Sequence, residues 1–221
     1  MNVKSLRKPR QIMDPIQNIY EAVVGGKNEE VSAFVQAGLD AGYTPADILQ
    51  KGFISAMAEV GRLYEEGISF VPEMMVSARA MKVGLEILKP FLADSGVESA
   101  GKVAVGTVQG DLHDIGKNLV AMMLEGAGFE IVDLGTDVPP EKLIASVREG
   151  VDVLALSSLL TTTMPNMATS IKAIKDAGLR DRVKIIIGGA PITVEYANQI
   201  GADGYAQDAS QAVNLTKSLM P

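Results

Sequence analysis

Residues 102–126 read KVAVGTVQGDLHDIGKNLVAMMLEG, and this stretch decides the fold. A short apolar run at 103–105 leads into a polar loop bounded by glycines, and apolar residues then recur at helical spacing. Similar apolar runs at 130–132, 153–156, 183–187 and 204–206 are each separated from the next by a helical stretch. This alternation indicates βαβ units and a parallel sheet. Five strands in about 120 residues predict a flavodoxin-like (Rossmann-like) doubly wound α/β domain with strand order 2-1-3-4-5.

The residues before this domain are predicted to be all helical. Helices start at Asp14-Pro15 and at Thr44-Pro45, where a capping side chain precedes proline, and the second of these lasts to Gly67. Another spans about 28–42, and a fourth runs from near Pro72 to just before Pro90. Four helices with short loops predict an antiparallel bundle. The polar stretch 94–101 predicts a linker, which divides the chain into a helical domain (1–93) and an α/β domain (102–221).

Composition excludes several classes of function. The 221 residues contain no cysteine and a single histidine, His113, which removes disulfides, zinc knuckles, iron–sulfur clusters and thiol catalysis. A net charge of −7 and 5% aromatic residues argue against a nucleic-acid partner. Basic residues near the N-terminus are not followed by an apolar segment, and no run approaches the length of a membrane span. We therefore expect a cytoplasmic protein with no membrane partner.

The predicted strand order also predicts where a ligand binds. In the order 2-1-3-4-5 the chain reverses direction between strands 1 and 3, so the loops at their carboxyl ends open a crevice. These loops are 109–116, which holds His113, and 157–163, which is rich in hydroxyls. The loop after strand 4, 188–190, is small enough for a ligand to approach the backbone. We expect the three loops to form one site.

Three familiar interpretations of these loops are disfavoured. A phosphate-binding loop would need four residues between its glycines, but five separate Gly110 from Gly116, and Asn118 stands where a magnesium-binding hydroxyl belongs. A nicotinamide dinucleotide site would need G-x-G-x-x-G after the first strand, and that pattern is missing. A receiver domain would need an aspartate where Ser157-Ser158 follows strand 3.

A lone histidine is more often a surface or satisfied core residue than a ligand. The position of His113, at the predicted crevice and between Asp111 and Asp114, favours a ligand. A carboxylate bonded to one ring nitrogen fixes the tautomer of a metal-binding imidazole. One protein ligand cannot hold a bare metal ion, but it can supply an axial ligand to a metal held by a macrocycle. The residues therefore predict a metal cofactor with its own equatorial ligands.

Residues 111–116 match the D-x-H-x-x-G motif of cobalamin-binding domains, which the chain resembles over nearly its whole length. The loop 157–163 and Gly188-Gly189 occupy the second and third signature positions of that family, and the helical half resembles the cap of corrinoid proteins from three-component methyltransferase systems. The resemblance implies that His113 is the lower cobalt ligand and Asp111 its hydrogen-bond partner. Thr163 would complete the relay, where the methionine synthase pattern has serine.

The resemblance also implies the rest of the cofactor site. The nucleotide tail would thread into the α/β domain, and the cap would cover the upper face of the corrin. Of the methionine pair in the cap, one is expected in the core and the other on the corrin, although such pairs are more often core. The implied cofactor-binding residues are Gly110, Asp111, Leu112, His113, Asp114, Ile115, Gly116, Ser157, Leu159, Thr161, Thr163, Gly188, Gly189, Tyr205, Ala206, Asp208, Met74 and Met75.

The function implied by the resemblance is that of a corrinoid methyl carrier. It would shuttle a methyl group on cobalt from a substrate-specific methyltransferase to a corrinoid:folate or corrinoid:thiol methyltransferase, with a reductive activase as a further partner. Catalysis would then require these partners, and the 94–101 linker would act as a hinge for the cap. The donor stays open among methylamines, methanol, betaines and aryl methyl ethers. The alternatives are a cobalamin-dependent regulator, although no basic helix-turn-helix region is visible, or a cofactor-storage protein.

Overall fold

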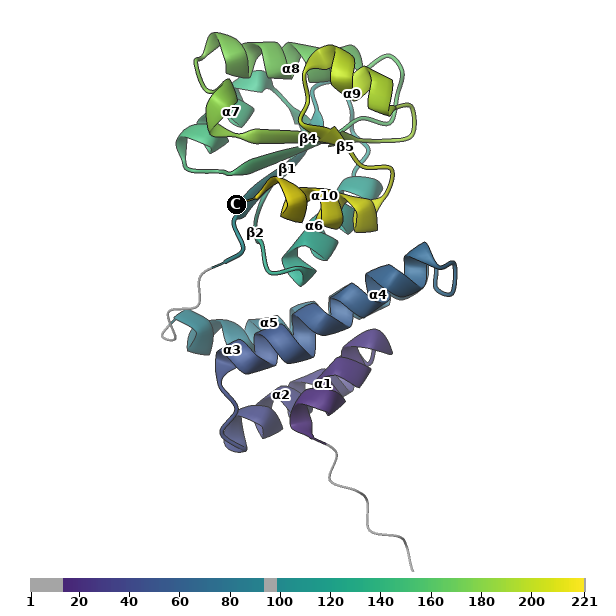
Figure 1. The fold of residues 1–221 in the computed structure, drawn as a ribbon, viewed down its shortest axis with the longest axis vertical. Helices are drawn as coiled ribbons and strands as arrows, with labels where there is room; N and C mark the ends of the chain where they lie inside the picture. Colours follow the sequence, from purple (N-terminus) through teal and green to yellow (C-terminus); the bar gives the residue numbers. More distant parts are fainter. Residues whose placement is uncertain (1–13, 94–98, 221) are drawn as a thin grey trace, which may run out of the picture.

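The computed structural model describes residues 14–93 and 99–220, and its C-terminal half is built on a five-stranded parallel sheet (Figure 1). The strand order is β2-β1-β3-β4-β5, which confirms the predicted order 2-1-3-4-5. Both β1 and β2 continue beyond the predicted apolar runs. The strands are β1 (Lys102–Val108), β2 (Glu130–Val138), β3 (Val153–Ser157), β4 (Lys184–Gly188) and β5 (Gly204–Tyr205).

Helices cover both faces of the sheet (Figure 1). One face carries α7 (Pro140–Arg148), α8 (Pro165–Asp176) and α9 (Val194–Ile200), and a 3₁₀ turn, η2 (Arg180–Arg182), leads into β4. The opposite face carries α6 (Ile115–Gly126) and α10 (Ala209–Leu219). Side chains alternate across the sheet, so that Val103 and Val105 belong to one buried cluster while Ala104 belongs to the other.

The N-terminal half is the predicted helical bundle, with two corrections. The segment expected as one helix from Thr44 to Gly67 is composite, because a π-helical stretch separates its first turn from its main part. The last helix also continues through Pro90 rather than ending before it. The bundle consists of α1 (Pro15–Val24), α2 (Asn28–Asp40), α3 (Pro45–Asp47), the π-helical η1 (Ile48–Ile54), α4 (Ser55–Glu65) and α5 (Val71–Ala93).

The predicted helix starts are confirmed by their caps. The Asp14 carboxylate accepts a hydrogen bond from the backbone N–H of Ile16 at 3.0 Å. The Thr44 hydroxyl accepts one from the N–H of Asp47 at 3.1 Å and donates to its carboxylate at 2.8 Å. Each cap satisfies an N–H that has no partner within its helix, and Pro15 and Pro45 stand where no such N–H is needed.

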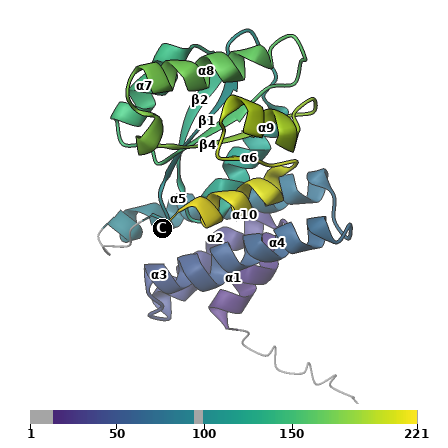
Figure 2. The same ribbon diagram turned by 45° about the horizontal axis from the view of Figure 1, so that its top comes forward.

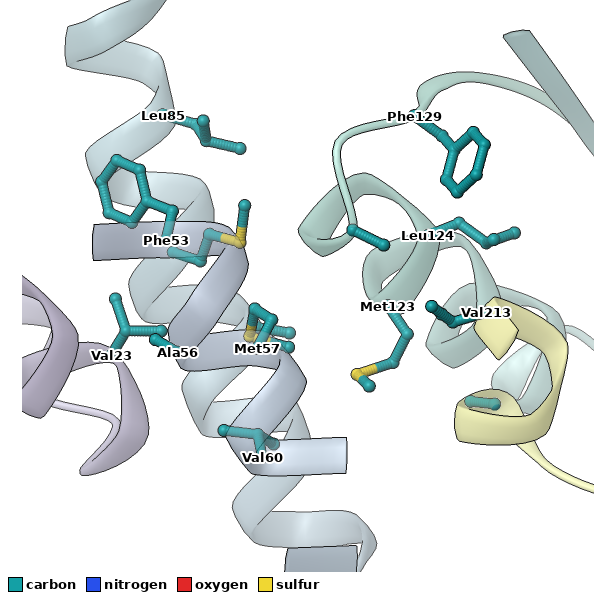
Figure 3. Close-up of a cluster of buried hydrophobic side chains, with 14 of the residues drawn as sticks. Val23, Phe53, Ala56, Met57, Val60, Leu85, Met123, Leu124, Phe129 and Val213 are labelled. Carbon is teal, nitrogen blue, oxygen red and sulfur yellow. The ribbon is translucent and has the colours of Figure 1, made fainter. Parts of the chain in front are cut away.

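The bundle and the α/β half share one hydrophobic core. Figure 3 shows Met57 and Val60 of α4 on one side of this core, with Met123 of α6 and Val213 of α10 on the other. The contact is close, because a Cβ built on Gly126 of α6 would lie 2.9 Å from Cγ of Met57. Residues 94–98 of the predicted linker lie outside the described residues, and the division of the chain at 94–101 stays a prediction.

A glycine inside the bundle makes its packing testable. An ideal Cβ on Gly84 of α5 would lie 2.4 Å from Cζ of Phe53 and 2.7 Å from Cγ1 of Val31. We therefore expect Gly84→Ala to lower the free energy of unfolding by about 1–3 kcal/mol through overpacking. Urea unfolding of the full chain, followed by circular dichroism, measures the change.

The matched control is Gly38→Ala in α2, where the added Cβ meets the end of the flexible Ile48 side chain at 3.2 Å. Alanine also favours a helix more than glycine does. The control should stay within about 1 kcal/mol of the wild type. Equal losses in the two variants would contradict this account of the packing.

Candidate functional site

A cavity of about 560 Å³ opens at the carboxyl ends of the strands, where the strand order predicts a crevice. Its walls come from the start of α6, the loops after β3 and β4, and the start of α10. Two residues of the bundle, Tyr64 and Met74, also line it. The sequence-predicted residues on its wall are Leu112, His113, Asp114, Ile115, Gly116, Ser157, Leu159, Gly188, Gly189, Ala206, Asp208 and Met74.

His113 lies at the edge of this cavity, and its orientation is set by Asp111. The ring Nδ1 is 2.9 Å from Oδ1 of Asp111, and the backbone N–H of His113 donates to the same oxygen at 3.0 Å. The hydroxyl of Thr107 donates to the carbonyl of His113 at 2.7 Å. From the Nδ1 contact we infer that the neutral ring carries its proton on Nδ1, which leaves the lone pair of Nε2 for a ligand.

The carboxylate of Asp111 is fully buried but well supplied with hydrogen bonds. Its second oxygen, Oδ2, accepts bonds at 2.8 Å from the N–H of Leu159 and from the hydroxyl of Thr163. Burial by itself would raise the pKa of Asp111, but the bonds from His113, Leu159 and Thr163 outweigh it and hold the pKa well below its usual range. Asp111 is therefore a stable anion inside the protein.

Ser158 is a member of this cluster that the sequence analysis missed. Its hydroxyl is fully buried and lies 2.8 Å from the hydroxyl of Thr163 and 3.4 Å from Oδ2 of Asp111. The resemblance implies Ser157 as a cofactor-binding residue, and Ser157 does line the cavity, but nothing in the spacing pointed to its neighbour Ser158. The structure brings Thr163 and Asp111 together as the resemblance implied, and the relay role stays a prediction.

Asp137, at the end of β2, is a second residue that the sequence analysis missed. Its carboxylate accepts a bond from the N–H of Gly110 at 2.7 Å, and its own N–H donates to the carbonyl of Asp111 at 3.0 Å. Its φ of +52° is uncommon for a residue other than glycine, although aspartate adopts it more readily than most. An aspartate two residues after Gly135, at the end of a strand, was the available signal. Asp137 thus anchors the loop that carries His113.

Gly188 and Gly189 allow three strand ends to approach one another. A Cβ on Gly189 would lie 1.8 Å from the carbonyl oxygen of Ser158, and its φ is +135°. A Cβ on Gly188 would lie 2.9 Å from the carbonyl oxygen of Ala206. Any larger residue here would push the loops apart and alter the cavity wall.

Several sequence-predicted residues do not line the cavity. Tyr205 packs against the cluster on the other face of the sheet, because neighbouring strand residues point to opposite faces, whereas Ala206 does line it. Thr161 is exposed outside the lining, and Met75 packs against the shared core while the fully buried Met74 contributes to the wall. Gly110, Asp111 and Thr163 lie behind the wall and support the loop of His113.

Two further findings concern metal binding and membrane-spanning helices. Within residues 14–93 and 99–220, no three histidine or carboxylate side chains come together in a way that would hold a metal ion. In the same described part of the chain, no helix combines the length and apolar character needed to cross a bilayer. One imidazole beside a large cavity suits a metal that brings its remaining ligands with it.

Comparisons with known proteins point to the same chemistry. Two families described as B12 binding domains match the chain, over residues 101–214 and 15–89. The chain is 40% identical to a corrinoid protein of Desulfitobacterium hafniense over 95% of this chain and 99% of that protein. It is 42% identical to dimethylamine corrinoid protein 1 of Methanosarcina acetivorans over 93% of this chain and 97% of that protein. In the methanol:cobalamin methyltransferase complex of Methanosarcina barkeri, a chain 32% identical superimposes with a TM-score of 0.80, covering 94% of this chain and 80% of that chain.

The buried anion gives a prediction about stability and pH. In Asp111→Asn an amide NH₂ replaces an oxygen that now accepts bonds from His113, Leu159 or Thr163, so a buried donor would face donors. We expect a loss of about 2–3 kcal/mol in the free energy of unfolding at pH 7. Because the native pKa of Asp111 is lowered, its stabilisation is present above about pH 4 and is lost as the pH falls toward the native value.

Urea unfolding at several pH values tests this expectation. The difference in the free energy of unfolding between wild type and Asp111→Asn should become smaller below about pH 4. The matched control is Asp114→Asn, because Asp114 is exposed and its carboxylate accepts a hydrogen bond from Asn118, one turn along α6. If this difference in the free energy of unfolding stays constant with pH, the carboxylate of Asp111 is not the buried charge that stabilises the protein.

Proposed function

Because the chain belongs to the family of B12-binding domains and binds cobalamin or a related corrinoid, we propose that it carries a methyl group between partner methyltransferases. The observation that carries this proposal is the environment of His113. It is the single histidine of the chain, it stands half-exposed at the cavity edge, and a buried carboxylate holds its Nδ1. A methyl carrier needs a protein ligand that can bind cobalt and dissociate from it without losing its own orientation.

The residues around His113 fit a corrin. Leu112 and Ile115, on either side of the histidine, are each 75% exposed, which is unusual for large apolar side chains next to a polar loop. An apolar macrocycle lying over His113 would cover them. The cavity behind has room for a nucleotide tail, and Gly116 leaves open space at the start of α6 because nothing lies within 4 Å of an added Cβ.

When bound, the corrinoid supplies a cobalt centre that accepts and gives up a methyl group. The chain's own residues orient and protect that centre. Nε2 of His113 would bind the cobalt, and Asp111 would keep the proton on Nδ1 through the 2.9 Å contact. The hydroxyls of Thr163 and Ser158 donate to Oδ2 of Asp111, and these bonds would keep the carboxylate in place beside the imidazole. Tyr64 and Met74 close the cavity on the cap side and exclude water.

The partner that loads the methyl group is a substrate-specific methyltransferase. The relatives named for dimethylamine and trimethylamine favour a methylamine as the donor, while the methanol complex shows that the same fold serves another donor. A folate- or thiol-specific methyltransferase would take the methyl group away, and a reductive activase would restore the carrier. We propose these two partners, and we also propose a cytoplasmic location and a hinge role for residues 94–101.

The ligand role of His113 can be tested by isotope labelling. Nitrogen-15 histidine labels only His113, because the chain has one histidine. In the chain reconstituted with corrinoid and reduced to cobalt(II), we expect the nitrogen coupling in the electron paramagnetic resonance spectrum to change with the label. His113→Ala should lose that coupling, and Gln109→Ala, an exposed residue of the same loop, should retain it. A spectrum indifferent to the label would rule out His113 as the ligand.

The carrier role calls for a separate experiment. The chain is loaded with corrinoid, reduced, and mixed with a trimethylamine-specific or dimethylamine-specific methyltransferase and the deuterated amine. We expect the deuterated methyl group to move to the protein-bound corrinoid, as measured by mass spectrometry, at least tenfold faster than with free cobalamin. Corrinoid binding without any methyl transfer to methylamine, methanol, betaine or aryl ether systems would favour a storage or regulatory role.

A further inference from the structure

A polar contact joins the cap to the α/β half next to the cavity. The carboxylate of Glu65, the last residue of α4, accepts bonds from the hydroxyl of Ser210 at 2.6 Å and from the side-chain amide of Asn214 at 3.1 Å. Ser210 and Asn214 are one helical turn apart on α10, so both reach the same oxygen. We call this contact the Glu65 clasp. Figure 2 shows α10 lying against the bundle at this junction.

Both helices of the Glu65 clasp also form the wall of the cavity. Tyr64, which precedes Glu65 on α4, lines the cavity from the cap side. Ala209 and Ala212, which alternate with Ser210 and Asn214 along α10, line it from the α/β side. The clasp therefore joins two helices that each contribute to the cavity wall.

A second cavity, beneath the clasp, has a largely polar lining. It has a volume of about 120 Å³ and lies between α4, α6 and α10. Arg62, Glu65 and Asn214 are among its lining residues, so polar groups rather than close apolar packing face one another here. Near the other end of the interface, a Cβ on Gly128 would lie 3.0 Å from Ile54, and Lys89 of α5 forms a 3.6 Å ion pair with Glu125 of α6. The end of this interface beside the main cavity therefore depends more on the hydrogen bonds of the Glu65 clasp.

We propose that Glu65 is a positioning residue that holds the cap closed over the cavity, and that release of its bonds to Ser210 and Asn214 sets how fast the cavity opens. The exposed position of Glu65 suits this role, because water can replace the lost bonds when the helices part. This inference concerns access to the cavity and goes beyond the proposed methyl transfer.

A reversible covalent lock tests the proposal. An ideal Cβ on Gly61 of α4 lies 3.9 Å from Cβ of Ser210, within the usual range of about 3.5–4.5 Å for a disulfide. The natural chain has no cysteine, so Gly61→Cys with Ser210→Cys can form a single defined bond across the junction. Uptake of hydroxocobalamin by the full-length apoprotein is followed by absorbance, before and after reduction of the bond.

We expect the oxidised protein to take up hydroxocobalamin at least tenfold more slowly than the same protein after reduction. Equal rates in the two states would overturn the proposal, because they would show that the cavity fills without parting α4 from α10. Uptake involves no methyl transfer, so a failure of the carrier function would leave this result unaffected.

Single substitutions test the clasp itself by hydrogen exchange of α4 and α10 in the full apoprotein. Glu65→Ala should increase exchange at the ends of both helices about tenfold, and Glu65→Gln, which keeps an acceptor, should restore part of the protection. The matched control is Glu66→Ala, because Glu66 is the next residue and pairs with Arg62 of its own helix. Equal exchange in the Glu65→Ala and Glu66→Ala variants would contradict a clasp at Glu65.

Discussion

The buried, ionised carboxylate of Asp111 is the interaction on which the site depends. A charge without solvent persists only where hydrogen bonds replace water, and here they come from His113, from the loop after β3 and from the Thr163 hydroxyl. Those donors belong to separate segments of the chain, so the anion ties the end of β1 to the end of β3. The orientation of the histidine follows from this attachment, and so does the side of the imidazole that faces a ligand.

The parallel sheet explains why these segments meet. Its register places Thr107, Ser157 and Gly188 in one row across β1, β3 and β4, at the edge where all their loops emerge. Helices α6 and α10 cover one face of the sheet, and the bundle packs on their outer side through the same cluster that forms its own core. The cap is therefore part of the core as well as a cover for the cavity, which makes its opening a balance between packing and a few polar contacts.

Sequence reasoning succeeded where a residue type has a single structural explanation. The strand order, the caps at Asp14 and Thr44 and the crevice holding His113 all followed from periodicity and position. It did not identify Ser158, which joins Thr163 beside Asp111, and it did not separate Tyr205 from Ala206, which point to opposite faces of the sheet. Asp137 was overlooked because its role depends on a left-handed backbone and on a partner 27 residues away.

The amino-acid sequence by itself determined the class of fold, the location of the crevice and the choice of His113, because periodicity and a unique imidazole are local properties of the chain. Only the tertiary structure decided that Ser158 joins Thr163 beside Asp111, which cap methionine reaches the cavity and how Glu65 meets α10. Those relations join residues as far apart as 149 positions. They depend on how the helices pack across the shared core, and packing distances are not encoded in any short stretch of sequence.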